Sequence, residues 1–345
     1  KIHEFPGEQY PGKLNRGMYM LFRKICGVDL GTDTIKICDK NEKKYVHEKN
    51  MIAVRDKAHV IAIGLKAFEM YEKAPVSVEA GSPMKNGGIA DVRNMGIVLN
   101  RLLKRYTNPV TKYPDILMTV PVGISELERM AFQQLLTGGI RSKRVALIEN
   151  GLADAAGIGM PVLHPMGNVV VNIGASATDI SVVSEGKVIV GKRLGIGGYR
   201  LDEDIRNIVR RRCDLSIGRR TSEILKNNLA YLLHGVPKQM KVYGIHTVTG
   251  LPVPVLVTSA DVNDAIADSL KEIVDAVKIT LERTPPQLAA DIQRNGVYLT
   301  GGVSQIPNFA EYAGRYLEIA TYQVPQPTAS TVRGLVRIMN DPQLG

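Results

Sequence analysis

VDLGTDTIKI (28–37) and VNIGASATDISVVS (171–184) follow one plan, and that plan indicates the architecture of the whole chain. In each segment an apolar strand carries a polar residue, Asp29 or Asn172, shortly before a glycine turn, and a second apolar strand follows. Two such hairpins a domain's length apart predict a duplicated α/β protein.

The segments around each hairpin alternate between strand and helix patterns. In the first half we expect helices over 93–106, over 125–136 and from about Leu152, with buried strands at 116–120 and 145–148. In the second half the longest helix begins at Ser259 as its N-cap and ends at Thr284-Pro285-Pro286. A strand at 297–299, the turn 300–302 and a helix from about Asn308 complete the pattern.

Composition agrees with a soluble globular protein of about two domains, since the chain has 345 residues, 44% of them hydrophobic. It excludes a disordered or fibrous chain. A net charge of +10 favours acidic partners such as phospholipid, nucleic acid or nucleotide. Three scattered cysteines and the absence of a long apolar run predict a cytoplasmic protein without a cysteine metal site. No histidine spacing suggests a metal ligand either.

Three glycine turns at strand ends are the strongest candidates for a binding site. They are Gly31-Thr32, Gly174-Ala175-Ser176 and Gly301-Gly302. Glycine permits close backbone approach, and the N–H groups of such turns form concavities that bind phosphate. One turn alone is weak support, whereas three together favour a nucleotide site. Neither the dinucleotide-binding fingerprint nor the Walker-type loop is present.

Several segments resemble the MreB family of bacterial actins. They are VDLGT (28–32), SPMKNGGIAD (82–91), VNIGASATDISVVS (171–184), GIGGYRLDEDI (195–205), VTGLP (248–252), LERTPPQLAADI (281–292) and YLTGG (298–302). The resemblance implies an actin-like, ribonuclease H-like α/β ATPase fold of two duplicated domains with a nucleotide cleft. We expect an N-terminal tail at 1–22, domain I at 23–166, domain II at 167–322 and a segment returning to domain I at 323–345.

The resemblance also implies the site residues and their ligands, ATP and Mg²⁺. In the first phosphate loop it places Asp29, Gly31 and Thr32, with Asp29 holding Mg²⁺ through water. The second loop contains Gly174, Ser176 and Thr178. The adenosine-side turn contains Gly301 and Gly302, and Lys226 lies on the helix that flanks adenine.

The chain departs from the family pattern where hydrolysis would occur. Asn150 replaces the Glu expected to orient the attacking water, and Asn172 replaces the Asp of the second hairpin. Ala175 and Ser176 interrupt the glycine run, while Asn228 and Val303 replace a Glu and a Gly near the nucleoside. An amide cannot supply a carboxylate's charge, so we expect slow hydrolysis unless Glu149 takes the vacant role.

The function expected from the resemblance is a filament that binds ATP, associates with the inner membrane face and organises cell-wall synthesis to determine cell shape. Its expected partners are copies of itself, anionic membrane and the cell-wall elongation machinery, without direct nucleic-acid binding. Met18, Leu21 and Phe22, followed by two basic residues, form a weak membrane-contact candidate. A plasmid-segregation actin and a small-molecule kinase on the same fold remain the alternatives.

The densest basic cluster is a second place where an acidic partner could bind. It comprises Arg206, Arg210, Arg211, Arg212, Arg219 and Arg220. A solvated helix face explains such a cluster equally well. Cys213 lies within it, where neighbouring cations would lower a thiol pKa, although simple packing is the commoner role.

Overall fold

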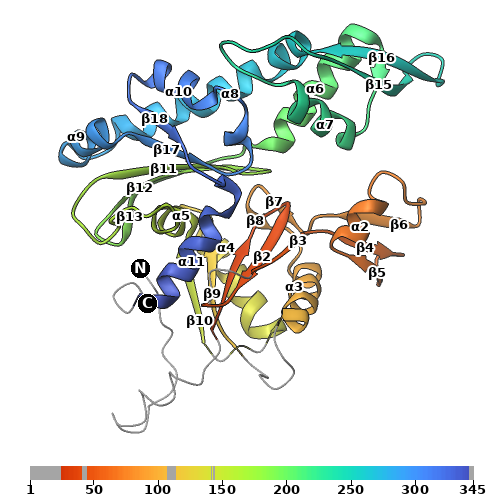
Figure 1. The fold of residues 1–345 in the computed structure, drawn as a ribbon. Helices are drawn as coiled ribbons and strands as arrows, with labels where there is room; N and C mark the ends of the chain where they lie inside the picture. Colours follow the sequence, from red (N-terminus) through yellow and green to blue (C-terminus); the bar gives the residue numbers. More distant parts are fainter. Residues whose placement is uncertain (1–24, 41–44, 107–113, 141, 143, 342–345) are drawn as a thin grey trace. The chain divides into compact units, whose positions relative to one another are not determined.

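The computed structural model describes residues 25–40, 45–106, 114–140, 142 and 144–341. These residues form two compact units (Figure 1). Unit 1 contains the described residues up to Pro165, Glu185–Val188 and those from Ala329 onward. Unit 2 contains Met166–Ser184 and Ile189–Thr328.

Unit 1 is built on a five-stranded sheet in the order β10-β9-β1-β2-β3. Its strands are β1 (Ile25–Leu30), β2 (Thr34–Cys38), β3 (Tyr45–Lys49), β9 (Asp115–Val120) and β10 (Val145–Glu149). β1 pairs antiparallel with β2 across the glycine turn, and parallel with β9, which pairs parallel with β10. The predicted first hairpin and the strands at 116–120 and 145–148 are therefore confirmed.

Helices cover this sheet and a smaller lobe extends from it. The helices are α3 (Val92–Tyr106), α4 (Glu126–Gln134) continued by a π-helix (Leu135–Gly139), α5 (Asn150–Ile158) and α11 (Ser330–Asn340). The lobe comprises β4 (Ile52–Arg55), β5 (His59–Ile63), α2 (Leu65–Met70) and β6 (Val78–Gly81). The short hairpin of β7 (Met84–Lys85) and β8 (Gly88–Ile89) packs on the main core of the unit through Met84. The prediction for α5 was two residues late, because Asn150 is already helical.

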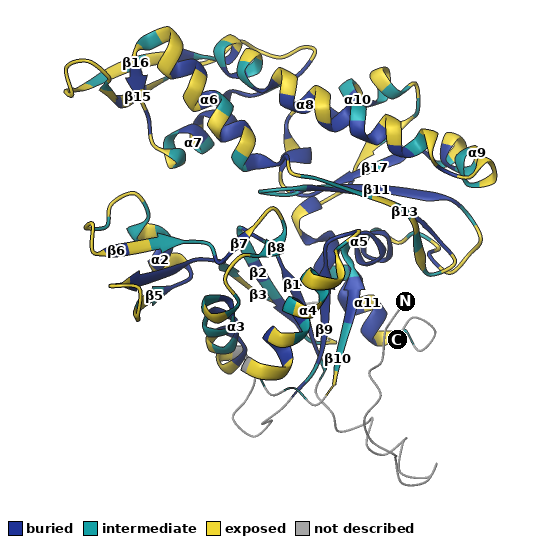
Figure 2. Cartoon of the chain, turned by 180° about the vertical axis from the view of Figure 1, so that it is seen from behind, coloured by how far each residue is buried: buried dark blue, intermediate teal, exposed yellow. Residues whose placement is uncertain are grey.

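Glycines allow α5 and α11 to pack closely. A Cβ on Gly334 would lie 1.7 Å from the Ala153 carbonyl oxygen, and one on Gly157 would lie 1.9 Å from that of Ser330. No side chain fits at either position. Figure 2 shows both helices largely buried.

Unit 2 repeats the sheet of unit 1. Its order is β13-β12-β11-β17-β18, with β11 (Asn168–Ile173), β12 (Thr178–Ser184), β13 (Lys187–Leu194), β17 (Val297–Thr300) and β18 (Thr321–Gln323). β11 pairs antiparallel with β12 and parallel with β17, as β1 does with β2 and β9. The register also matches, since Asp29 lies opposite Lys36 and Asn172 opposite Asp179. The predicted duplication is confirmed.

The helices of unit 2 are α6 (Gly198–Cys213), α7 (Arg219–Leu229), α8 (Ser259–Glu282), α9 (Pro286–Asn295) and α10 (Phe309–Leu317). α8 buries Ile266, Leu270, Ile273 and Val277, which a period of 3.6 residues places on one face of the helix. Its N-cap is Thr258 rather than Ser259, because the Thr258 hydroxyl and the Asp261 carboxylate form a reciprocal capping box.

A three-stranded sheet lies beside α6, α7 and α8. Its order is β14-β15-β16, with β14 (Leu215–Ser216), β15 (Gln239–His246) and β16 (Pro252–Thr258). One face of this sheet packs on the apolar core of unit 2 through Val242 and Val257. In Figures 1 and 2 the β15–β16 hairpin and α9 lie at opposite ends of the unit.

Candidate functional site

In unit 1, the predicted residues of the first loop and of the hydrolysis site lie at one edge of the sheet. β1, β9 and β10 run parallel, so the residues that follow their carboxyl ends share that edge. Asp29 and Gly31 stand at the end of β1, and Glu149 and Asn150 at the end of β10. β9 lies between these two strands.

Asp29 forms an ion pair that was not predicted from the sequence. Its Oδ2 atom lies 2.8 Å from the Lys36 Nζ atom, and each side chain is only 11% exposed. The two residues face each other across the hairpin. The pairing could have been anticipated, because both stand at equivalent distances from the Gly31 turn. Lys36 thus brings a positive charge to the edge where phosphate binding is predicted.

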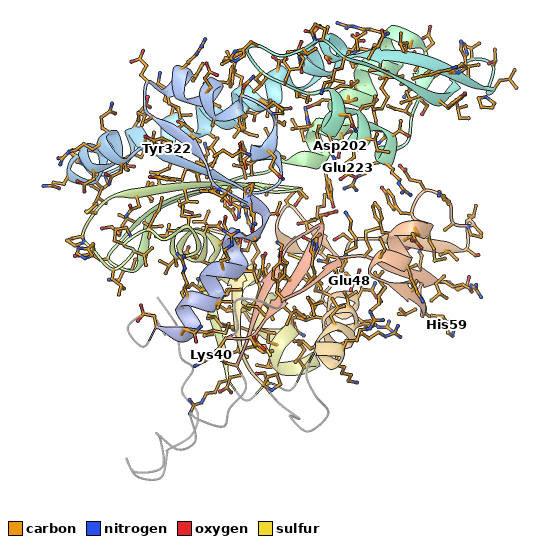
Figure 3. The ribbon with its side chains drawn as sticks, in the orientation of Figure 1. Lys40, Glu48, His59, Asp202, Glu223 and Tyr322 are labelled. Carbon is orange, nitrogen blue, oxygen red and sulfur yellow. The ribbon has the colours of Figure 1, made fainter. Side chains whose placement is uncertain are left out.

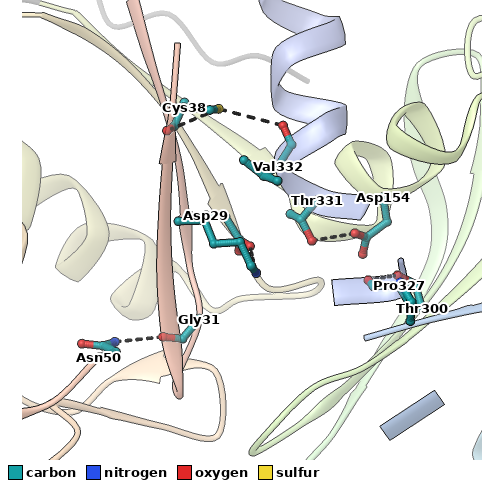
Figure 4. Close-up of polar contacts among 11 residues, drawn as sticks. Asp29, Gly31, Cys38, Asn50, Asp154, Thr300, Pro327, Thr331 and Val332 are labelled. Atoms are coloured by element: carbon teal, nitrogen blue, oxygen red, sulfur yellow. Dashed lines mark hydrogen bonds and ion pairs between the residues drawn. The ribbon is translucent and has the colours of Figure 1, made fainter. Parts of the chain in front are cut away.

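Three further contacts hold the Gly31 turn. The Gly31 N–H donates to the Thr34 carbonyl at 3.1 Å, and the Asn50 side chain donates to the Gly31 carbonyl at 2.9 Å (Figure 4). The Ser82 hydroxyl donates to the Thr32 carbonyl at 2.8 Å. Ser82 belongs to the SPMKNGGIAD segment, which therefore supports the first loop.

Glu149 and Asn150 begin α5. Glu149 is its N-cap and forms no side-chain capping hydrogen bond, and Asn150 is the first helical residue. One turn further on, Asp154 is fully buried and accepts a 2.7 Å hydrogen bond from the Thr331 hydroxyl of α11 (Figure 4). Since Asp154 is already used in packing, Glu149 is the carboxylate at this helix end that remains half-exposed.

In unit 2, the second loop and the adenosine-side turn adjoin each other. β11 and β17 are parallel, so Asn172, Gly174 and Gly301 lie at one sheet edge. Gly301 has a φ of +85°, and a Cβ there would lie 2.4 Å from the Ile173 oxygen and 2.6 Å from the Asn172 Oδ1 atom. This close approach requires glycine.

The β17 end is tied to the chain that follows β18. The Thr300 hydroxyl donates to the Pro327 carbonyl at 2.7 Å, and the Gly301 N–H donates to the same oxygen at 3.2 Å (Figure 4). Gly302 is exposed beside buried Gly301 and Val303.

The start of α6 closes over the second loop. The N–H groups of Gly198 and Tyr199 donate to the carbonyls of Gly174 and Ala175, at 3.0 Å and 2.7 Å. A Cβ on Gly197 would lie 2.7 Å from the Gly174 oxygen, so this helix start also needs glycine. The GIGGYRLDEDI segment therefore packs against the second loop, and no residue of it was predicted to belong to the candidate site.

The second loop retains donors that could bind phosphate. The N–H group of Ala175 forms no backbone hydrogen bond within the described part of the chain. Ser176, beside it, is half-buried in the turn. A glycine turn with an N–H group that is not used by the backbone fits an anionic ligand. The buried Thr178 hydroxyl donates to the Ile196 carbonyl at 2.7 Å and positions β12 against the chain that leads into α6.

Lys226 is fixed from the start of α6. Its Nζ atom lies 2.6 Å from the Asp202 carboxylate and 3.1 Å from the Gly198 carbonyl. Burial raises the pKa of Asp202 above its ordinary value, against the lowering effect of Lys226, and Glu223 raises it further (Figure 3). Asn228 is turned onto its own helix, where its amide donates to the Ile224 carbonyl at 2.8 Å.

In unit 1, Asp29 is a carboxylate that could face Mg²⁺ on a bound nucleotide. Mg²⁺ is commonly held by one or two carboxylates together with substrate phosphates, and Asp29 fits that requirement. Among the described residues no group of three or more His, Cys, Asp or Glu side chains could hold a metal on its own.

Parts of the basic cluster are engaged in structure. Arg212 pairs with Asp261 and Asp264 at the start of α8, and the Arg206 guanidinium donates to the Ile217 carbonyl. The suggestion of a lowered thiol pKa at Cys213 was wrong. Burial raises that pKa, Asp261 raises it further, and these effects outweigh Arg212.

The membrane-contact candidates Met18, Leu21 and Phe22 lie outside the described residues. Within the described chain no helix has the length and apolar character needed to cross a membrane.

Comparison with known sequences agrees with this geometry. The sequence model described as MreB/Mbl protein matches residues 23–344. The cell shape-determining protein Mbl of Bacillus cereus is 34% identical over 291 residues, which cover 82% of this chain and 85% of Mbl. The cell shape-determining protein MreB of Escherichia coli is 33% identical over 327 residues, 92% of this chain and 93% of MreB.

Solved structures give the same result. MreB5 of Spiroplasma citri bound to ADP has a TM-score of 0.85 and 28% identity, covering 91% of this chain and 95% of MreB5. The same protein bound to AMPPNP has a TM-score of 0.86. A MamK double helical filament, at 18% identity and a TM-score of 0.77, shares the fold. The predicted actin-like fold is therefore confirmed.

Proposed function

The chain belongs to the MreB/Mbl family of actin-like, cell shape-determining proteins, and from this premise we propose that it binds ATP and assembles into filaments. We further propose that the filaments lie on the cytoplasmic face of the membrane and organise cell-wall synthesis. Its partners are then other copies of itself, anionic lipid and the cell-wall elongation machinery. Direct nucleic-acid binding is not part of the proposal.

The observation that carries ATP binding is the arrangement at the β11 and β17 ends of unit 2. Here the Gly174–Thr178 turn, the Gly197-Gly198 start of α6 and the Gly301-Gly302 turn are packed together by contacts that exclude a Cβ at Gly197 and Gly301. We propose that the turn N–H groups and Ser176 hold phosphate, and that Gly301, Gly302 and Lys226 line the nucleoside side. Thr178 positions the loop.

In unit 1 we propose that Gly31 and Thr32 present backbone to phosphate, with Lys36 beside them as a charge partner. Asp29 is the carboxylate that would face Mg²⁺ through water. When bound, Mg²⁺ would neutralise phosphate charge.

We also propose that hydrolysis is slow. The residue at the start of α5 that would orient water is Asn150, and an amide neither accepts a proton nor carries charge. Glu149 precedes it as the N-cap, where its half-exposed carboxylate could partly substitute.

Electron microscopy of the purified protein with and without ATP, together with nucleotide affinity and phosphate release, tests this proposal. Filaments that form with ATP, a measurable affinity and little phosphate release are expected. A monomer that phosphorylates a small molecule would favour the kinase alternative. Filaments recruited to DNA through an adaptor would favour the plasmid-segregation alternative.

A further inference from the structure

Lys36 is a cation at the phosphate edge proposed for unit 1. Its Nζ atom donates to the Asp29 Oδ2 atom at 2.8 Å, and only 11% of its side chain is exposed. A Lys ammonium has three N–H donors, and among the described residues Asp29 accepts from one of them. Two donors therefore remain for a ligand that binds beside the Gly31 turn.

The ion pair lies on the face of the sheet that points away from the main core of unit 1. Val28 on β1 and Met118 on β9 are register partners within that core. Asp29 and Thr119 follow them along the two strands, so both point to the opposite face. Lys36 shares this face, because it pairs with Asp29 across the hairpin. A carboxylate, an ammonium and a hydroxyl are therefore gathered on three neighbouring strands.

The Thr119 hydroxyl shows that the described chain leaves this cluster incomplete. Thr119 is only 2% exposed, and its Oγ1 atom has no hydrogen-bond partner among the described residues. Buried polar atoms of folded proteins nearly all have a partner, either in the protein or in ordered water. An unsatisfied hydroxyl near an ammonium with spare donors is what we expect where a ligand and its water bind.

Lys36 already balances the charge of Asp29 within the fold. Mg²⁺ is held in proteins by one or two carboxylates together with substrate phosphates. A fixed ammonium at the carboxylate disfavours a divalent cation there, since like charges repel strongly at short range. The same ammonium attracts phosphate, because Lys binds phosphate as a point charge. Lys36 can therefore join the carboxylate to a phosphate, as Mg²⁺ would.

We propose that Lys36 is a phosphate-binding residue whose ammonium bridges Asp29 and bound ATP, so that the chain keeps most of its ATP affinity without Mg²⁺. Lys36 takes this role at the ATP site proposed above, on which the inference rests. Where Mg²⁺ does bind, Asp29 remains the carboxylate that it would face, and the metal adds to a charge that Lys36 already supplies.

The Mg²⁺ dependence of ATP affinity tests this role without any substitution. The purified full chain is dialysed to equilibrium against radiolabelled ATP, in buffer with Mg²⁺ and in buffer with EDTA. The protein concentration is kept below that at which filaments form, so that assembly does not contribute to the measured affinity. We expect the removal of Mg²⁺ to weaken binding by less than about tenfold, which is below the usual value of one charged hydrogen bond.

Substitution of Lys36 should make ATP binding depend on Mg²⁺. In EDTA, the affinity of Lys36→Met should fall by about tenfold to 100-fold, the usual value of a hydrogen bond to a charged group. Mg²⁺ should recover most of this loss, because Asp29 is then free to face the metal. Lys36→Arg keeps the positive charge and should recover most of the affinity in EDTA.

Two further variants control for stability and for the loss of a lysine. Asp29→Asn/Lys36→Met avoids the unpaired buried carboxylate, and it should bind ATP weakly both in EDTA and in Mg²⁺. Lys271→Met removes an exposed ion pair with Asp275 on α8, and it should leave both affinities unchanged. The Mg²⁺ dependence of the unmodified chain and the double variant decide the question even if Lys36→Met does not fold.

The outcomes separate the role of Lys36 from ATP binding itself. If the unmodified chain binds ATP with Mg²⁺ and loses more than about tenfold in EDTA, the role of Lys36 is overturned and ATP binding stands. If Lys36→Met or the double variant binds in EDTA as tightly as the unmodified chain, the charge comes from another residue and the inference also fails. If the unmodified chain binds ATP under neither condition, the inference and the proposed ATP binding fail together.

Discussion

The ion pair between Asp29 and Lys36 makes the first loop sensitive to a single residue. Both side chains are nearly buried and 2.8 Å apart, so Lys36→Met leaves the Asp29 carboxylate buried without its partner. Breaking such a pair costs about 3 kcal/mol. We expect a loss of that size in the free energy of unfolding, measured by urea denaturation without nucleotide.

The double variant Asp29→Asn/Lys36→Met is the control for that prediction. Removing both charges avoids the unpaired carboxylate, so its loss should be clearly smaller than that of Lys36→Met. If the two variants lost the same free energy of unfolding, the cost would come from removing the lysine and not from leaving the Asp29 carboxylate without a partner.

Asn150 is the residue at which the hydrolysis proposal is most directly tested. Asn150→Glu restores a carboxylate able to orient and deprotonate water at the start of α5. We expect phosphate release to rise at least about tenfold, which is less than the roughly 100-fold to 10,000-fold effect of a fully effective general base. The affinity for ATP should change little, and Asn228→Glu is a matched substitution at another departure from the family pattern. An unchanged rate in Asn150→Glu would place the limiting step elsewhere.

The residues of the site were only partly predictable from sequence. Asp29, Gly174 and Gly301 are detectable because a polar residue or glycine at a strand end is a local signal. Lys36 and Asp202 were missed because their importance arises from a partner that only the fold brings within reach. The resemblance placed Thr178 in the second loop, whereas the hydrogen bond from its hydroxyl to the Ile196 carbonyl depends on the fold.

At the scale of elements, the N-terminus of α8 links helix stability to pH. Burial raises the pKa of Asp261, but its hydrogen bonds from Thr258 and Arg212 outweigh this effect and hold the pKa below its ordinary value. A carboxyl with a lowered folded pKa stabilises the protein above about pH 4 and loses that contribution as the pH falls further. Thr258→Ala should therefore cost about 1 kcal/mol at pH 7.

The same variant should lose less stability than the unmodified chain between pH 5 and pH 3, since Asp261 then titrates closer to its ordinary pKa. Urea unfolding at both values measures this difference. Asp264→Asn removes the other carboxylate partner of Arg212 and leaves the capping box intact, so its effect should stay below about 1 kcal/mol. If Thr258→Ala lost as much stability between pH 5 and pH 3 as the unmodified chain, the hydrogen bonds from Thr258 would not be the cause of the lowered pKa of Asp261.

Elements with strong local signals were predicted well. The two glycine hairpins and the buried face of α8 follow from periods of two and 3.6 residues. The α8 cap was misplaced by one residue because Thr258 and Ser259 are both good caps, and only the reciprocal bond to Asp261 distinguishes them. β15 and β16 were not predicted, because the exposed apolar residues Tyr243, Ile245 and Leu256 blur the alternation that marks a half-buried strand.

At the scale of the whole molecule, the duplication relates two sheets that carry different charges at matched positions. Unit 1 pairs Asp29 with Lys36, and unit 2 pairs Asn172 with Asp179. The repeated hairpin thus preserves backbone geometry while its polar residues have diverged. Asp29 balances the charge of Lys36, so this pair contributes nothing to the net charge of +10.

ATP should stabilise the folded chain as a whole if the proposed site is real. A ligand that binds only the folded state adds about 2.7 kcal/mol at a concentration 100 times its Kd. For a chain of this size that corresponds to a rise in the melting temperature of several degrees.

Gly197→Ala forces a methyl group against the second loop and should abolish most of the ATP-induced rise, whatever it does to the melting temperature without ATP. Gly81→Ala, where a Cβ meets open space, should keep the full rise. Scanning calorimetry of the three proteins with and without ATP decides the matter, because a rise retained in Gly197→Ala would exclude the second loop as the phosphate site.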